Sequence, residues 1–218
     1  MNVLIACEES QEVCKAFRAK GHRAFSCDLQ ECSGGHPEWH IQGDALQLIN
    51  GNCEFQTADT HTHTQRGRWD LIIAHPPCTY LTCAGAVRMR VNGELQTERF
   101  AKAMEARDFF LAFLNADCDH VAVENPTPMK IVQLPPYSQA IQPYEYGHPY
   151  SKRTCLWLKG LPPLMATEIV PDHVPYVNGG SKDAHGNYRR FQGRGERDQK
   201  TRSKTFSGIA KAMAEQWG

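Results

Sequence analysis

The sequence predicts an α/β protein built on a doubly wound, mostly parallel sheet with helices on both faces. Short apolar runs alternate with segments of helical periodicity along the chain. Several of these runs break at polar or proline-bearing turns, as buried parallel strands do where they end at a ligand site. The 218 residues are enough for one such domain with a full core.

Each predicted element has its own local signal. Strands are expected at 3–6, 24–28, 40–45, 69–74, 121–124 and 154–158, and helices at 10–20, 97–115 and 206–217. Gly21 ends the first helix, and the long middle helix carries apolar residues at helical spacing. Residues 50–68 are polar and irregular, so we expect an exposed insertion there.

Composition excludes several classes of protein. The formal net charge is +0, from 24 basic and 24 acidic residues, which argues against a globally basic binder but allows a local basic patch. No apolar stretch is long enough to span a membrane, and the first residues do not resemble a signal peptide. The nine cysteines form no CxxC pair. We therefore expect a cytoplasmic protein with reduced thiols and no metal site.

Two predicted strands end on reactive side chains. The run that ends at Ala74 is followed by His75-Pro76-Pro77-Cys78, where two prolines fix the direction of the chain and present the thiol rigidly. The later run ends at Glu124-Asn125-Pro126, where partial burial is expected to raise the carboxyl pKa. When a thiol lies beside a carboxyl, the thiol can attack an electron-poor ring and the carboxyl can donate protons to the ring or accept them from it. The alternatives are a buried core cysteine and a simple turn.

Acidic residues also follow the second and third predicted strands. Asp28 is placed to accept hydrogen bonds from the hydroxyls of a ribose, and Asp44 from an exocyclic amine. Together they suit a cofactor that contains adenosine, although both can instead be caps or turn residues. The turn after the first strand lacks a glycine-rich fingerprint. The residues assigned to this cofactor site are Ala6, Cys7, Glu8, Ser10, Asp28, Leu29, Asp44, Ala45 and Pro76.

A basic stretch lies between Lys182 and Lys204. It contains eight Lys or Arg residues, among them Arg189, Arg190 and Arg194, against three acids. Glycines and two aromatic residues interrupt it. This composition favours a loop that contacts nucleic-acid phosphates over an ordinary solvated loop.

Three segments in order resemble the DNA cytosine-5 methyltransferase family. They are Pro76-Pro77-Cys78, Val123-Glu124-Asn125 and the segment from Tyr146 to Thr154. The resemblance covers residues 1–160 and, more faintly, the last helix, and it is to compact members of the kind common among phage and prophage genes. It implies a Rossmann-like methyltransferase domain formed by 1–160 plus 205–218. Residues 161–204 would then form a short basic segment that contacts substrate.

The resemblance implies S-adenosylmethionine as cofactor and DNA as partner, with a cytosine flipped out of the duplex. Cys78 would add to C6 of the base, Glu124 would hold its N3 edge, and Lys152 or Arg153 would help to hold the base. Further substrate contacts are expected at Pro77, Asn125 and Pro126, and, from the basic stretch, at Arg189, Arg190 and Arg194.

The chain also departs from the family pattern. Cys7-Glu8-Glu9-Ser10 replaces the glycine-rich first motif, and little room remains for a target recognition domain. Two alternatives therefore stay open. One is a related modification of RNA or of a free nucleotide, and the other is a catalytically silent nucleic-acid binding module on the same fold.

Overall fold

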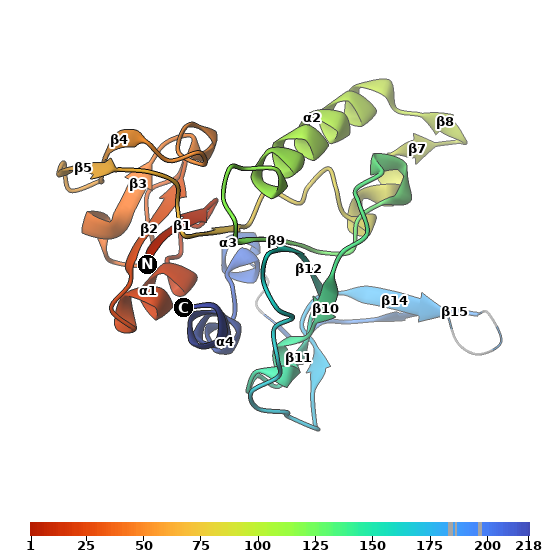
Figure 1. The fold of residues 1–218 in the computed structure, drawn as a ribbon. Helices are drawn as coiled ribbons and strands as arrows, with labels where there is room; N and C mark the ends of the chain where they lie inside the picture. Colours follow the sequence, from red (N-terminus) through yellow and green to blue (C-terminus); the bar gives the residue numbers. More distant parts are fainter. Residues whose placement is uncertain (183–184, 186, 196–197) are drawn as a thin grey trace.

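A seven-stranded sheet forms the centre of the molecule, shown as a computed structural model in Figure 1. The structure describes residues 1–182, 185, 187–195 and 198–218. The strands of this sheet are β1 (Asn2–Ala6), β2 (Arg23–Asp28), β3 (His40–Gln42), β6 (Leu71–Ala74), β9 (Val121–Asn125), β10 (Gln139–Ile141) and β12 (Thr154–Lys159). Their order is β10-β12-β9-β6-β1-β2-β3. Strands β3, β2, β1, β6 and β9 are parallel, whereas β12 is antiparallel to both of its neighbours. The predicted Rossmann-like α/β fold is thus confirmed.

The strand order reverses at β1, from which the chain builds the sheet first toward β3 and later toward β9. In open α/β sheets, ligands bind beyond the carboxyl ends of the strands at such a switch point. The register here is level, since Ala6 pairs with Ala74 and Ala74 pairs with Val123. The residues that follow these three, on β1, β6 and β9, therefore reach the same edge of the sheet side by side.

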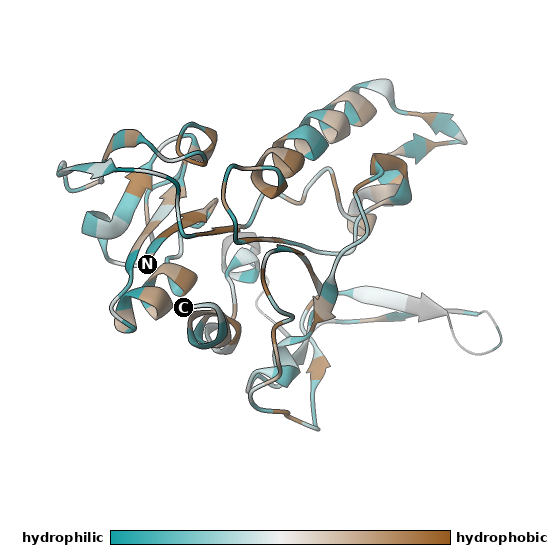
Figure 2. Cartoon of the chain, viewed as in Figure 1, coloured by the Kyte–Doolittle hydropathy of each residue, from teal (hydrophilic) through white to brown (hydrophobic). Residues whose placement is uncertain are grey.

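Both faces of the sheet are covered, by different elements. Val3 and Ile5 of β1 point to the face covered by α1 (Glu12–Ala19) and α4 (Ser207–Trp217), which lie side by side in Figure 1. Alternate residues such as Leu4 point to the face covered by α2 (Thr97–Leu114). Figure 2 shows hydrophobic residues on the central strands and mostly hydrophilic ones on the hairpins β4–β5 and β7–β8.

The prediction of an exposed insertion over 50–68 is wrong in part. This segment forms a hairpin of β4 (Cys53–Gln56) and β5 (Thr62–Gln65). Phe55 is only 7% exposed and packs edge-on against Phe25 of β2, with ring centroids 5.0 Å apart. A single apolar residue among polar neighbours has no periodic signal. Its packing, together with hydrogen bonds from Arg23 to Gln65 and Thr64, holds the hairpin against β2.

Several short elements lie outside the central sheet. The strands are β7 (Arg90–Val91), β8 (Glu94–Leu95), β11 (Tyr150–Ser151), β13 (Val174–Pro175), β14 (Gly179–Lys182) and β15 (Tyr188–Phe191), and α3 is a short helix (Gln199–Ser203). Single 3₁₀ turns occur at Pro37–Trp39, Ala45–Gln47, Lys130–Val132 and Pro143–Glu145, and a longer one at Cys83–Arg88. The hairpins β7–β8 and β14–β15 project on the same side of the molecule (Figure 1). In the described ranges, no helix is long and apolar enough to cross a membrane.

Replacing Phe110 by alanine is expected to destabilise the protein by about 3–5 kcal/mol. Phe110 is fully buried in α2 and meets the ring of Trp157 of β12 edge-on, with centroids 4.9 Å apart. Phe109→Ala is the matched control, because that neighbouring side chain is only partly buried and leaves a smaller cavity. Urea unfolding of both variants measures the difference. Equal losses of stability would contradict the packing described here.

Candidate functional site

The thiol of Cys78 and the carboxyl of Glu124 come together at the carboxyl edge of the sheet. Glu124 lies on β9 and Cys78 follows the end of the adjacent strand β6, so the parallel register brings their loops together. His75 is the first residue after β6, and its Nδ1 lies 3.2 Å from Oε2 of Glu124. Cys78 is half-buried and feels the charges of both Glu124 and Lys152.

Backbone pairing holds the two loops in a fixed relation. The amide of Cys83 donates to the carbonyl of Thr127 at 2.9 Å, and the amide of Met129 donates to the carbonyl of Leu81 at 2.7 Å. These bonds tie the loop after Cys78 to the segment after Glu124-Asn125.

Asn125 and the prolines complete this connection. The side chain of Asn125, which is 1% exposed, donates from Nδ2 to the carbonyl of Pro76 at 3.1 Å. Pro76 is buried as well, whereas Pro77 is exposed and Pro126 half-buried. Asn125 therefore joins the end of β9 to the Pro-Pro turn that presents the thiol.

The pKa of Glu124 departs from the sequence-based expectation. Burial alone raises the pKa of a carboxyl, as we predicted. In the structure the hydrogen bond and positive charge of His75, with the charge of Lys152, outweigh burial and hold the pKa of Glu124 below its ordinary value. The predicted rise is therefore wrong, because it took account of burial and not of these two cations. The carboxyl is ionised at neutral pH.

His75 is a site residue that the sequence analysis missed. Its side chain is 10% exposed, and burial by itself lowers the pKa of an imidazole. Here the hydrogen bond to Glu124 and the charges of Glu124 and Glu8 raise the pKa of His75 instead. The sequence signal that could have identified His75 is its position, directly after a buried strand and before Pro76.

Cys78 rests as a thiol and not as a thiolate. Burial and the charge of Glu124 raise the pKa of this thiol, and Lys152 opposes them only in part. The nucleophile is the thiolate, so a reaction at Cys78 needs removal of its proton.

The two basic residues expected near the base lie in different environments. The charge of Lys152 acts on the Cys78 thiol. The Nζ of Lys152 donates to the carbonyl of Arg202 at 2.8 Å and lies 5.8 Å from the ring centroid of Phe206, so these contacts fix the ammonium group. Arg153 donates from Nη2 to the hydroxyl of Tyr137 at 2.7 Å and covers the ring of that residue. Lys152 thus contributes charge to the site, whereas Arg153 is engaged by a tyrosine.

The turn after β1 has unusual geometry. Cys7 and Gln11 both have φ of 59°, a left-handed conformation that favours glycine. The Gln11 amide bonds both backbone groups of His36, with Nε2 donating to the carbonyl and Oε1 accepting from the amide. Ser10, the residue before Gln11, is also buried. The loop after β2 therefore folds back over the turn and stabilises it in place of a glycine-rich sequence.

The carboxylate of Glu8 is turned toward α1. It accepts hydrogen bonds from the amides of Val13 at 2.7 Å and Cys14 at 3.2 Å, so it caps the start of the helix. Burial raises the pKa of Glu8, which the nearby charge of His75 partly offsets. The charges of Glu8, in the turn after β1, and of His75 therefore influence each other.

The acids of the expected cofactor site gather beyond the ends of β1, β2 and β3. Asp28 and Asp44 both lie near the thiol of Cys7, whose pKa is raised by burial and by their charges. Each also accepts a local backbone hydrogen bond, Asp28 from Gln30 and Asp44 from Leu46. Leu29, beside Asp28, is 74% exposed. Ala6 and Ala45 are buried. Carboxylates beside an exposed apolar side chain are the kinds of group that bind the hydroxyls and the flat base of a nucleoside.

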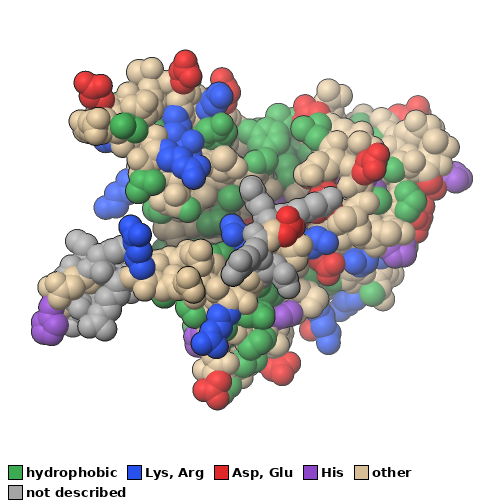
Figure 3. Space-filling model, turned by 180° about the vertical axis from the view of Figure 1, so that it is seen from behind, with side chains coloured by type: hydrophobic (Ala, Val, Ile, Leu, Met, Phe, Trp, Pro, Cys, Tyr) green, Lys and Arg blue, Asp and Glu red, His purple; other side chains and the backbone are tan. Residues whose placement is uncertain are grey.

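The basic segment is described only in part. Arg190 of β15 and Arg194 just beyond it are exposed. The side chain of Arg189 lies outside the described residues, as do residues 183–184, 186 and 196–197 entirely. Figure 3 shows a hollow between the projecting β14–β15 hairpin and the arm formed by β7–β8, with Lys and Arg side chains on both sides.

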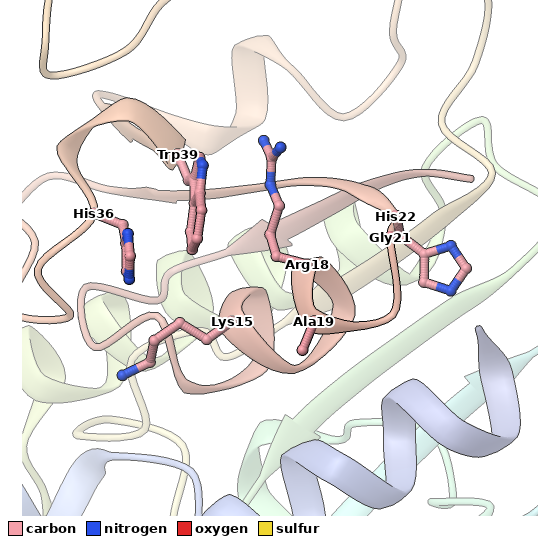
Figure 4. A pocket seen from close by; sticks show the side chains of 7 residues that line it. All are labelled: Lys15, Arg18, Ala19, Gly21, His22, His36 and Trp39. Atoms are coloured by element: carbon pink, nitrogen blue, oxygen red, sulfur yellow. The ribbon is translucent and has the colours of Figure 1, made fainter.

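A separate surface depression lies over α1. It has a volume of about 530 Å³ and is lined by Lys15, Arg18, Ala19, Gly21, His22, His36 and Trp39 (Figure 4). The rings of His36 and Trp39 stack at 3.8 Å, and the guanidinium of Arg18 lies 5.1 Å from the Trp39 ring. This depression contains none of the predicted site residues. Among the described residues, no three His, Cys, Asp or Glu side chains are grouped to hold a metal ion.

Comparisons with known proteins give little further information. No protein-family model matches the sequence, and no curated protein sequence matches it either. Among solved structures, a methyltransferase of Entamoeba histolytica is similar over 78% of this chain and 57% of its own, with 11% sequence identity and a TM-score of 0.40. The chain thus spans little more than half the length of that protein. A likeness at this level carries no argument about function, so the assignment depends on the site itself.

The reactivity of Cys78 is expected to follow its charged neighbours. Glu124→Gln removes the negative charge that raises the thiol pKa, so alkylation by iodoacetamide at pH 8 should accelerate several-fold. Lys152→Met removes a positive charge that lowers the thiol pKa, so it should slow the alkylation of Cys78. Peptide mass spectrometry can measure each cysteine separately, with the exposed Cys83 as internal control. Unchanged rates at Cys78 in both variants would contradict the electrostatic site.

Proposed function

We propose that the protein transfers a methyl group from S-adenosylmethionine to C5 of a cytosine base in DNA, through a covalent adduct with Cys78. The observation that carries this proposal is the convergence of Cys78, Glu124 and Lys152 at the carboxyl edge of the sheet. A thiol, a carboxylate and a cation at a switch point match what nucleophilic attack on a pyrimidine requires.

The residues of the site divide the chemistry between them. In this proposal the Cys78 sulfur would bond C6 of the ring, and the Glu124 carboxyl would hold N3 and the exocyclic amine. Lys152 stabilises both the thiolate and negative charge on the base. When bound, S-adenosylmethionine supplies an electrophilic methyl group. Loss of the C5 proton then releases Cys78 and restores the aromatic ring.

Acidic residues and an apolar surface support binding of that cofactor beside the thiol. Asp28, Asp44 and Leu29 would hold the adenosine part beyond β1–β3, and the turn at Cys7 would contact the remainder. Because β1 and β6 are adjacent, a cofactor bound there would lie next to the Cys78 loop.

The two projecting arms favour a polymeric substrate over a free nucleotide. Arg90 of β7 and Arg190 of β15 are exposed, as is Arg88 just before β7. Figure 3 shows Lys and Arg side chains on both sides of the hollow between the arms. Such cations contact successive phosphates. A cytosine in a duplex must be flipped out to reach a half-buried thiol, at a cost of a few kcal/mol.

Incubation with radiolabelled S-adenosylmethionine and mixed DNA is expected to place label in 5-methylcytosine. Cys78→Ala should abolish this transfer, because the adduct cannot form. Cys83→Ala is the matched control and should retain it, since that exposed thiol lies on the same loop but is not placed in the site. Label that persists in Cys78→Ala would contradict the mechanism. Label in RNA or free cytidine nucleotides alone would favour the alternative substrates.

DNA affinity is expected to depend on the β14–β15 hairpin. Arg190→Ala combined with Arg194→Ala should weaken binding to all sequences and reduce the salt slope by about one for each phosphate that is no longer neutralised. Lys211→Ala is the control, because this exposed lysine lies on α4 and pairs with Glu215. Fluorescence anisotropy over a range of salt concentrations measures both effects. An unchanged slope would exclude this hairpin from the DNA interface.

A further inference from the structure

His75 is a buried imidazole with one directed contact. Its Nδ1 lies 3.2 Å from Oε2 of Glu124, and its Nε2 is buried with no hydrogen-bond partner among the described residues. It precedes Cys78 on the same short turn after β6. The imidazole is thus directed at the carboxyl that is placed to hold the base.

The charges that face His75 come from three other elements. Glu124 approaches from β9, Glu8 from the turn after β1, and Lys152 from the segment before β12. Two carboxylates oppose one ammonium, so the surroundings favour a proton on the imidazole despite its burial. The same arrangement keeps Glu124 ionised. At rest, the proton shared by this pair is therefore on His75.

Lys152 is the other cation near Glu124, but its described contacts point elsewhere. Its Nζ donates to the carbonyl of Arg202, and the rings of Tyr176 and Phe206 lie about it. An imidazole titrates near neutral pH, so it exchanges its proton readily with a neighbouring carboxyl. His75 is the better proton donor to the carboxyl.

We propose that His75 is a positioning residue that orients the Glu124 carboxyl through Nδ1 and supplies, through it, the proton taken up at N3 of the target pyrimidine. This inference rests on the proposed function and adds to it. In the resting enzyme the proton shared by His75 and Glu124 lies on the imidazole, and Glu124 is the group that passes this proton to the pyrimidine ring.

The proton and electron pair are accounted for at each stage. The Cys78 thiol gives its proton to water, and the thiolate forms the S–C6 bond while the ring electrons shift toward N3. The ionised Glu124 carboxylate takes the Nδ1 proton from His75 and passes it to N3, which leaves the imidazole neutral. When C5 exchanges its hydrogen with water and Cys78 leaves, the N3 proton returns by the same path and the imidazole is protonated again.

Exchange of the C5 hydrogen tests this inference without the methyl donor. Release of tritium from DNA labelled at C5 of cytosine reports reversible attack by Cys78 alone. His75→Asn keeps an N–H that can donate to Glu124 but cannot titrate, and it should lower the exchange rate about 10²-fold. His120→Asn is the matched control, because His120 lies just before β9, at the opposite end from Glu124.

The pH profile separates a proton donor from a structural role. In the wild type the rate should rise with pH as Cys78 ionises and then level off above the pKa of His75, because loss of the imidazolium cancels the gain in thiolate. In His75→Asn the rate should be lower and should continue to rise toward the pKa of Cys78. Identical profile shapes would overturn the inference and leave the proposed function intact. No exchange in the wild type would overturn both.

A titration by NMR gives an independent readout in the wild-type protein. The His75 ring should titrate above the ordinary pKa of about 6.5, and Glu124→Gln should lower that pKa by about one unit or more. A His75 pKa that is unchanged by Glu124→Gln would show that the two side chains do not share a proton, and would overturn the inference even if His75→Asn failed to fold.

Discussion

The level parallel register of β1, β6 and β9 is the constraint on which the rest of the site depends. Ala6, Ala74 and Val123 lie abreast, so the turn at Cys7, the imidazole of His75 and the carboxyl of Glu124 emerge at one edge. A slip of one residue on β9 would turn Glu124 to the opposite face of the sheet. The buried apolar residues on both faces of these strands prevent such a slip, which means that the core also specifies the geometry of the site.

Within that edge, electrostatic coupling determines how the groups behave. Glu124 carries negative charge because His75 and Lys152 outweigh its burial. Burial of the thiol, together with the charge of Glu124, raises the pKa of Cys78 and keeps it protonated. The Cys78 thiol thus stays protonated, and weakly reactive, until its surroundings change. A cysteine that stays protonated is protected from oxidation and adventitious alkylation, since both act on the thiolate.

Much of the fold could be predicted from the sequence because the central strands are strongly apolar and end at clear turns. The hairpin that contains Phe55 could not, because one aromatic residue among polar neighbours has no periodicity. Strand β10 is short and its pairing to β12 depends on residues distant in the sequence. For short segments of this kind, tertiary packing and not local pattern decides the conformation.

The site shows a similar division. Cys78 and Glu124 could be predicted to meet, since parallel strand ends share an edge. The ionisation of Glu124 could not, because it depends on the orientation of His75 and on the approach of Lys152 from a segment far along the chain. Glu8 was likewise predicted to be a cofactor residue, whereas the structure turns its carboxylate to the amides of α1. Side-chain direction of this kind follows from packing and is not visible in a motif.

The central claim is that Cys78 and Glu124 act on the same pyrimidine ring. Intact-mass and peptide mass spectrometry of the protein after incubation with S-adenosylmethionine and a 5-fluorocytosine oligonucleotide tests it most directly, because fluorine at C5 blocks release of the thiol. The account predicts a stable adduct at Cys78 that is absent or strongly reduced in Glu124→Gln. An adduct on another cysteine, or one at Cys78 that forms equally well without the Glu124 carboxylate, would contradict it.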